Sequence, residues 1–189
     1  MCGNDGLEFE IPNGFQTFVP KENPDKLTNN FRFFISDDNT IIYKKVFSTE
    51  NIFSRLLEDV DKFLLFERIL SNDFFDGAIK KHIVCGFELE KDGSYKSKFI
   101  EGYRLDLLAN ESPPVNIQKK ILDQCKILID ALDETDRQGN LCGDWALHNL
   151  IYSVTDDCIF NVDLEGFVTY NPLPEWANMG HIRKWLGNL

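Results

Sequence analysis

Two stretches decide the fold: Gly143-Asp144-Trp145-Ala146-Leu147-His148-Asn149-Leu150-Ile151-Tyr152 and Phe160-Asn161-Val162-Asp163-Leu164-Glu165-Gly166-Phe167. Asp144 and Asn149 stand five positions apart, just before an apolar run that predicts a short strand. Asp163 ends the next apolar run, and Gly166 follows it closely. An aspartate can orient or deprotonate a hydroxyl, and amide and carboxylate oxygens are the ligands that Mg²⁺ prefers. The spacing therefore favours a site for a magnesium-bound nucleotide.

These stretches resemble the catalytic loop and metal-binding strand of the protein-kinase-like superfamily, which includes aminoglycoside, choline and RIO-like kinases. The loop of that family reads H-x-D-x-x-x-x-N and its metal motif D-F-G or D-x-x. Asp144 and Asn149 match the loop, and Asp163 with Gly166 matches the metal motif. The resemblance implies an α+β, two-lobed fold that binds ATP and Mg²⁺. It gives Asp144 the catalytic role and makes Asn149 and Asp163 metal ligands.

The same residue types also fit purely structural roles. Asp144 could make turn hydrogen bonds, Asn149 could satisfy local backbone groups, and Asp163 could cap a strand end. His148, next to Asn149, is expected to be structural rather than catalytic. Glu165 could assist a metal at Asp163 or stand exposed to solvent.

The composition of the chain limits the classes of protein to which it can belong. The chain has 189 residues, of which 43% are hydrophobic, and this length allows one domain or two closely packed lobes. Its net charge of -11 disfavours nucleic-acid partners, because phosphate backbones are bound mainly by Lys and Arg. The five cysteines are odd in number and form no C-x-x-C pair, which favours reduced thiols in the cytoplasm. No apolar run is long enough for a membrane span, and the N-terminus lacks a signal-peptide pattern.

Upstream, the pattern predicts a small antiparallel sheet with one helix. Phe15–Val19 is a predicted strand, and two β-branched and aromatic runs, 31–35 and 40–47, predict a hairpin around a turn at 36–39. Apolar residues at helical spacing predict a helix that Ser48 or Thr49 caps and that runs to about Leu70. Strand-like runs then follow at 82–89 and 95–100, joined by an Asp-Gly turn.

A lysine in this sheet is the candidate phosphate contact. The segment Ile41-Ile42-Tyr43-Lys44-Lys45-Val46 resembles the V-A-I-K strand of kinases, and alternation puts Ile42 and Lys44 on one face. Lys45 is the alternative, and a solvent-facing lysine pair is the structural reading. The resemblance implies a carboxylate partner on the 50–70 helix, where Glu58 and Asp59 both remain possible.

The remaining segments complete the expected organisation, a single kinase-like domain over 1–189 with a sheet lobe at about 15–100. Glu101-Gly102-Tyr103-Arg104-Leu105 resembles the hinge of small-molecule kinases, so Glu101 and Tyr103 are implied nucleotide contacts. A reduced helical lobe is expected at about 106–189. One helix starts at Ser112-Pro113-Pro114 and ends near Asp133, the acidic run 132–136 is expected to be a solvated loop, and a last helix carries Trp176 and Trp185.

Several departures from the family bear on activity. Cys142 stands where the loop usually has His or Tyr, and Ala146 stands where protein kinases have Lys. The segment 20–30 lacks the glycines of a nucleotide flap. We therefore expect an ATP- and Mg²⁺-dependent phosphotransferase acting on a hydroxyl of a protein or small molecule. The alternatives are a pseudokinase that serves as a nucleotide-binding module, and a kinase-like enzyme that transfers AMP.

Overall fold

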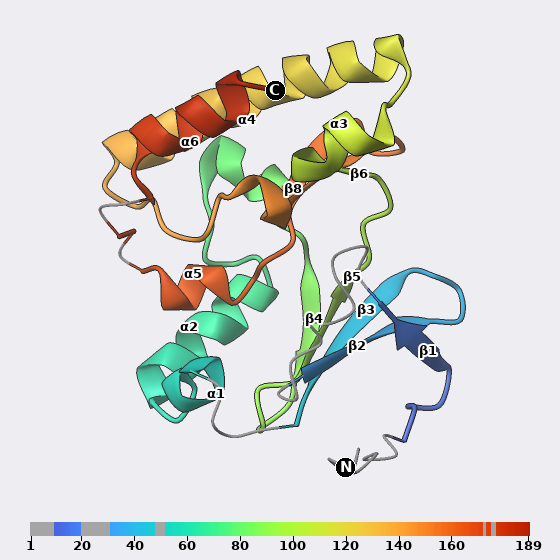
Figure 1. Cartoon of the computed structure of the whole chain (residues 1–189). Helices are drawn as coiled ribbons and strands as arrows, with labels where there is room; N and C mark the ends of the chain where they lie inside the picture. Colours follow the sequence, from blue (N-terminus) through green and yellow to red (C-terminus); the bar gives the residue numbers. More distant parts are fainter. Residues whose placement is uncertain (1–9, 20–30, 48–51, 172, 175–176) are drawn as a thin grey trace, which may run out of the picture.

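The chain folds as a mixed α+β structure with a five-stranded antiparallel sheet, a three-stranded antiparallel sheet and several helices (Figure 1). The computed structural model describes residues 10–19, 31–47, 52–171, 173–174 and 177–189. In Figure 1 the five-stranded sheet occupies one end of the molecule and the long helix α4 the other. The mixed α+β class expected from the sequence is confirmed.

The five-stranded sheet forms from the runs that the sequence marks as strands. Its order is β1 (Phe15–Phe18), β2 (Phe31–Ser36), β3 (Ile41–Val46), β5 (Tyr95–Lys98) and β4 (Gly86–Leu89). The predicted hairpin of β2 and β3 is confirmed, and Ser36 Oγ accepts hydrogen bonds from the backbone of Thr40 and Ile41 across its turn. The Asp-Gly turn between β4 and β5 is also confirmed.

Register decides which lysine faces the interior of the molecule. Lys44 pairs with Phe33 on one side and Tyr95 on the other, so these three side chains share a face of the sheet. Lys45 points to the opposite face, where its Nζ lies 2.8 Å from Glu90 Oε2 and 3.0 Å from Asp92 Oδ2. Lys44 therefore shares a face of the sheet with Ile42, and Lys45 lies on the opposite face.

The predicted 50–70 helix is divided into α1 (Ile52–Leu56) and α2 (Val60–Leu70). The break occurs because Asp59 is the N-cap of α2, where its carboxylate accepts hydrogen bonds from the backbone N–H groups of Asp61 and Lys62. A single helix was therefore the wrong prediction. The proposed caps Ser48 and Thr49 lie outside the described residues.

The predicted strand over 82–89 is only half right. Residues Gly77–His82 form the 3₁₀ helix η2, and β4 begins at Gly86. The reason is tertiary: the buried His82 ring hydrogen-bonds Ile159 O at 2.8 Å, and the backbone N–H of Val84 donates to Asn161 O. These bonds tie the segment to the C-terminal part of the chain instead of to the sheet.

The C-terminal part packs helices against a short three-stranded sheet. The strands are β6 (Tyr103–Arg104), β7 (Leu150–Ser153) and β8 (Cys158–Asn161). The helical segments are η3 (Leu105–Leu107), α3 (Leu108–Glu111), α4 (Val115–Arg137), η4 (Leu147–Asn149), α5 (Gly166–Thr169) and α6 (Met179–Gly187). Helix α4 runs on through the acidic segment 132–136, so the predicted loop there was wrong. Its polar side chains lie on the solvated face of an amphipathic helix whose Leu132 is fully buried.

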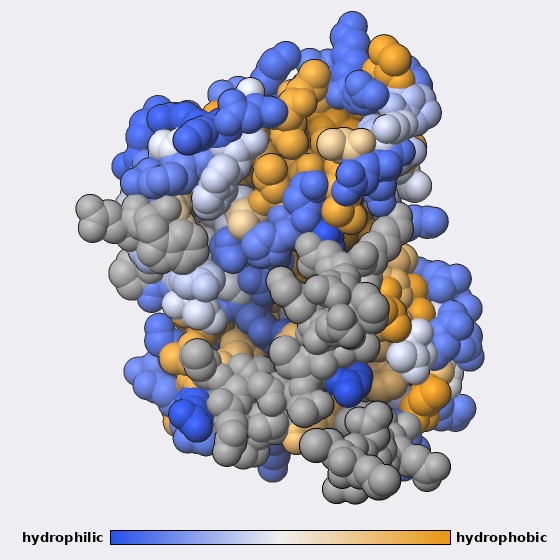
Figure 2. Space-filling view, in the orientation of Figure 1, coloured by the Kyte–Doolittle hydropathy of each residue, from blue (hydrophilic) through white to orange (hydrophobic). Residues whose placement is uncertain are grey.

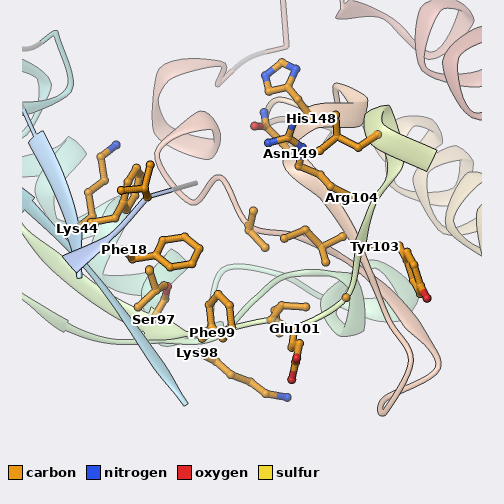
Figure 3. A pocket seen from close by; sticks show the side chains of 18 of the residues that line it. Phe18, Lys44, Ser97, Lys98, Phe99, Glu101, Tyr103, Arg104, His148 and Asn149 are labelled. Carbon is orange, nitrogen blue, oxygen red and sulfur yellow. The ribbon is translucent and has the colours of Figure 1, made fainter. Parts of the chain in front are cut away.

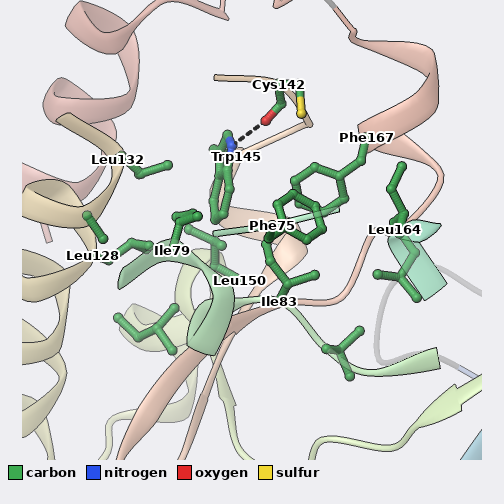
Figure 4. Close-up of a cluster of buried hydrophobic side chains, with 14 of the residues drawn as sticks. Phe75, Ile79, Ile83, Leu128, Leu132, Cys142, Trp145, Leu150, Leu164 and Phe167 are labelled. Atoms are coloured by element: carbon green, nitrogen blue, oxygen red, sulfur yellow. Dashed lines mark hydrogen bonds between the residues drawn. The ribbon is translucent and has the colours of Figure 1, made fainter. Parts of the chain in front are cut away.

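A hydrophobic core supports the loop that carries Asp144. Trp145 is buried between aromatic and aliphatic side chains, and its indole N–H donates to Cys142 O at 2.8 Å (Figure 4). The ring of Phe167 packs edge-on against both Trp145 and Phe75. Cys142 is therefore a buried core residue, and its carbonyl oxygen holds Trp145 of the loop in place. Trp176 lies outside the described residues, and Trp185 packs half-buried against the core.

The surface carries charged side chains together with apolar areas. Figure 2 shows hydrophobic side chains gathered beside α3, with hydrophilic side chains on either side of them. None of the helices within the described ranges is both long and apolar enough to cross a lipid bilayer.

Candidate functional site

A pocket of about 740 Å³ lies between the five-stranded and three-stranded sheets, within the usual range for sites that bind small molecules (Figure 3). Strands β1, β2, β3 and β5 form one wall, and the segment 100–104 with η4, β7 and Val162 forms the other. Its lining is mainly apolar. The residues that decide its chemistry are Lys44, Ser97, Glu101, Arg104, Glu111, His148 and Asn149.

The segment predicted as a hinge borders this pocket. Glu101 and Tyr103 both line it, but Figure 3 shows the ring of Tyr103 pointing away from Lys44 and Asn149. The segment is held in place because Tyr103 pairs with Tyr152 of β7. A Cβ on Gly102 would come within 2.0 Å of Tyr152 O, so only glycine allows this close approach.

Lys44 lies at one end of the pocket, and its side chain is almost fully buried. Its Nζ forms an ion pair with Glu165 Oε1 at 2.6 Å. The same Nζ stands over the ring of Phe31, 4.3 Å from the ring centroid. Its carboxylate partner therefore comes from the loop after β8, while Glu58 and Asp59 of the α1–α2 region are exposed.

Hydrogen bonds between asparagine side chains and backbone groups bring together Asp144, Asn149 and Asp163. The carbonyl oxygen of Asp144 accepts from Asn161 Nδ2 at 2.8 Å and from Asn149 Nδ2 at 3.4 Å. Asn161 Oδ1 in turn accepts from the backbone N–H of Asp163 at 2.9 Å. Asn161, fully buried at the end of β8, therefore joins the Asp144 loop to the Asp163 loop.

Gly166 brings the two aspartates close to each other. A Cβ built on Gly166 would lie 2.7 Å from Asp163 Oδ2 and 3.1 Å from Asp144 Cβ. The space between the two carboxylate-bearing residues is thus available only because position 166 has no side chain. Asn149 lines the pocket, whereas the half-buried Asp144 and Asp163 stand beyond its described lining.

The pKa of the Asp163 carboxyl group is unusually high. Burial is the main cause that raises its pKa to about 7, and the negative charges of Glu165 and Asp144 raise it further, while Lys44 lowers it. Three carboxyl groups share this region with one lysine, so the cluster has a surplus of negative charge that a bound cation would relieve.

No group of three His, Cys, Asp or Glu side chains with metal-binding geometry occurs within the part of the chain that the structure describes. Mg²⁺ is commonly held by one or two protein ligands together with water and phosphate oxygens. Asn149 and Asp163 would supply that number of protein ligands.

Asp144 also makes the turn hydrogen bond that was considered as its purely structural role. Asp144 Oδ1 accepts the backbone N–H of Ala146 at 3.0 Å, which is a turn hydrogen bond. Its other carboxylate oxygen has no hydrogen bond within the described residues. Asp144 is thus held by one carboxylate oxygen in the turn that precedes η4.

Sequence reasoning did not single out Asn161, expected His148 to be structural, and left Glu165 open between metal binding and solvent exposure. His148 was expected to be structural, yet it is exposed and lines the pocket beside Asn149 (Figure 3). Asn161 reads as an ordinary strand residue, and nothing local marks it as the link between two loops. Glu165 stands two positions after Asp163, and this proximity was the one available signal that it belongs to the site.

Comparison with known proteins places the chain in no family. No family model matches the sequence, and no curated protein matches it.

Proposed function

We propose that this protein is an ATP- and Mg²⁺-dependent phosphotransferase with a two-lobed, protein-kinase-like fold. In this proposal residues 15–100 are the sheet lobe, 101–105 the hinge and 106–189 a reduced helical lobe. The nucleotide occupies the 740 Å³ pocket, and its γ-phosphoryl group is transferred to a hydroxyl.

One observation carries the proposal: a single pocket is bordered by Lys44, by the segment Glu101–Tyr103 and by Asn149. These groups come from three distant parts of the sequence, each of which resembles the corresponding kinase segment. A chance likeness in sequence gives no reason for the three segments to meet around one cavity of nucleotide size.

Each residue has a distinct part in the proposed reaction. Lys44 contacts the phosphates, and the backbone around Glu101 and Tyr103 borders the base. Asn149 and Asp163 hold the magnesium ion, which when bound neutralises charge on the phosphates. Asp144 orients the acceptor hydroxyl and accepts its proton through the carboxylate oxygen that the Ala146 turn leaves available.

The acceptor is proposed as a hydroxyl on a protein or on a small molecule. Ala146 stands where protein kinases carry a lysine, and this tilts the choice toward a small or atypical acceptor.

A second candidate function is a pseudokinase that binds nucleotide without turnover. The observation in its favour is that Lys44 Nζ already has two partners, the Phe31 ring at 4.3 Å from the ring centroid and Glu165 Oε1 at 2.6 Å.

Phosphoryl transfer is tested by incubating the protein with γ-labelled Mg·ATP and a pool of small alcohols and proteins. The proposal predicts label in an acceptor, and a loss of at least about 100-fold in rate for Asp144→Ala and for Asp163→Ala. Nucleotide binding without label transfer would favour the pseudokinase. Mass spectrometry of the products separates both from AMP transfer, which adds AMP instead of phosphate.

A further inference from the structure

The ion pair of Lys44 and Glu165 joins the five-stranded sheet to the C-terminal part of the chain. Lys44 belongs to β3 of the five-stranded sheet, and Glu165 belongs to the loop that also carries Asp163. Both side chains are largely buried, with 10% and 14% of their side-chain surfaces exposed. A contact at 2.6 Å in such surroundings is worth more than an exposed pair, because solvent screens it less.

The described residues give Glu165 no second polar partner that could explain its burial. Its Oε1 makes no hydrogen bond of good geometry within the described ranges, so the ion pair with Lys44 is its one described polar contact. Burying a carboxylate for a single ion pair is costly unless the pair serves a purpose. A surface glutamate would have avoided that cost.

The α1–α2 region does not supply the lysine with a carboxylate. Asp59 is occupied as the N-cap of α2, and Glu58 is exposed to solvent. Position 165 therefore takes over a role that the family resemblance assigns to a helix.

We propose that Glu165 is the positioning residue for Lys44, whose ammonium group it holds beside the loop that carries Asp163. This inference rests on the proposed function. Because Glu165 and Asp163 are two positions apart on one loop, the lysine and the metal ligand are set by a single backbone segment. No movement of α1 or α2 is then needed to assemble the phosphate site.

The loop that carries Glu165 is closely packed against the residues around it. Gly166 packs against Asp163 and Asp144 so closely that a Cβ there would collide with both. The next residue, Phe167, is fully buried against Trp145 and Phe75. The hydrophobic core thus holds the backbone on the C-terminal side of Glu165. The Glu165 carboxylate in turn holds the Lys44 ammonium group through the ion pair.

The test compares the affinities of Mg·ATP and adenosine for the wild type, Glu165→Gln, Lys44→Met and the double variant. Glu165→Gln should weaken Mg·ATP binding about tenfold or more, because the amide cannot hold the lysine in charge-assisted contact. Its affinity for adenosine should stay unchanged, because adenosine has no phosphates for Lys44 to contact. This second ligand also shows that the variant is folded.

Non-additivity separates positioning from other roles of Glu165. In the Lys44→Met background, Glu165→Gln should have no further effect on ATP affinity, since Glu165 acts through the lysine. The loss should also persist with EDTA and ATP alone, whereas a direct metal ligand would matter only when Mg²⁺ is present. Glu90→Gln is the matched control, because Glu90 pairs with the neighbouring Lys45 on the opposite face.

The outcomes are distinct. If the wild type binds adenosine and ATP but Glu165→Gln binds ATP equally well or more tightly, the positioning role is overturned while the proposed function stands. Additive effects of the two substitutions overturn it as well. If the wild type binds no nucleotide at all, the proposed function fails and the inference falls with it.

Discussion

At the scale of single residues, Asp163 should make stability depend on pH. Its pKa is raised to about 7 in the folded protein from the ordinary 3.8, mainly by burial. Between these values the unfolded chain is ionised while the folded protein keeps the proton. The free energy of unfolding therefore falls as pH rises from about 4 to 7, by roughly 2 to 4 kcal/mol for a half-buried group.

Asp163→Asn should remove this loss. Urea unfolding at pH 4.5, 6 and 8 without nucleotide should show the variant gaining stability over the wild type as pH rises. Asp123→Asn, at an exposed position on α4 beside Lys126, is the control and should run parallel to the wild type. Parallel curves for Asp163→Asn would contradict the assigned cause.

His82 should have the opposite effect to Asp163, because it makes the free energy of unfolding fall as the pH is lowered. Its ring donates a hydrogen bond from Nδ1 to Ile159 O, and its buried Nε2 has no partner within the described residues. Burial lowers its pKa to about 4 from 6.5, so the unfolded chain takes up a proton first as the pH falls. Stability present above pH 6.5 is lost on the way to pH 4, by about 3 kcal/mol.

His82→Asn keeps a donor for Ile159 O but cannot titrate. Its free energy of unfolding should be lower than that of the wild type at pH 7, and its decline between pH 6.5 and 4 should be smaller by about that amount. Chemical denaturation across this range checks the result, with the exposed His181→Asn as control. An unchanged acid slope in the His82 variant would show that this ring is not the source.

At the scale of elements, the join between the segment 100–104 and β7 is the most constrained contact near the pocket. Gly102→Ala would force a Cβ into Tyr152 O, so β6 and β7 would have to separate. We expect a loss of about 3 kcal/mol or more in unfolding free energy, together with weaker nucleotide binding. Gly187→Ala, which meets open space at the end of α6, should be neutral. A Gly102→Ala protein of wild-type stability would mean that this contact is looser than described.

Elements with short-range signals were predictable from sequence. The β2–β3 hairpin is coded by aromatic and β-branched runs around a turn that Ser36 hydrogen-bonds. The α2 break was missed because Asp59 reads as one of several acidic residues until its capping bonds are visible. His82–Cys85 looked like a strand because apolar composition cannot show that its partner is β8.

The residues of the candidate site likewise divide into those that the sequence marks and those that only the structure reveals. Asp144, Asn149 and Asp163 could be picked out because their spacing is local. The partner of Lys44 could not, because Glu165 is far away in sequence and only the packing of the loop against the sheet brings the two together. Asn161 was missed for the same physical reason, since its two hydrogen bonds lie in different loops.

At the scale of the whole molecule, the pocket depends on how the two sheets face each other. The five-stranded sheet brings Lys44 to the pocket and η4 brings Asn149, while Asp163 stands beyond the pocket's described lining. The surplus of negative charge around Asp163 makes the protein alone a poor binder of free phosphate, so the proposed function requires a cation to accompany the nucleotide.

Isothermal titration calorimetry of the wild type with ATP, in the presence and absence of Mg²⁺, tests the central claim most directly. The account predicts saturable binding of one nucleotide that is at least about tenfold tighter with Mg²⁺, and that Asp163→Asn loses this metal-dependent gain. A well-folded protein whose titration shows no heat of binding with Mg·ATP, or equal affinity with and without the metal, would contradict it.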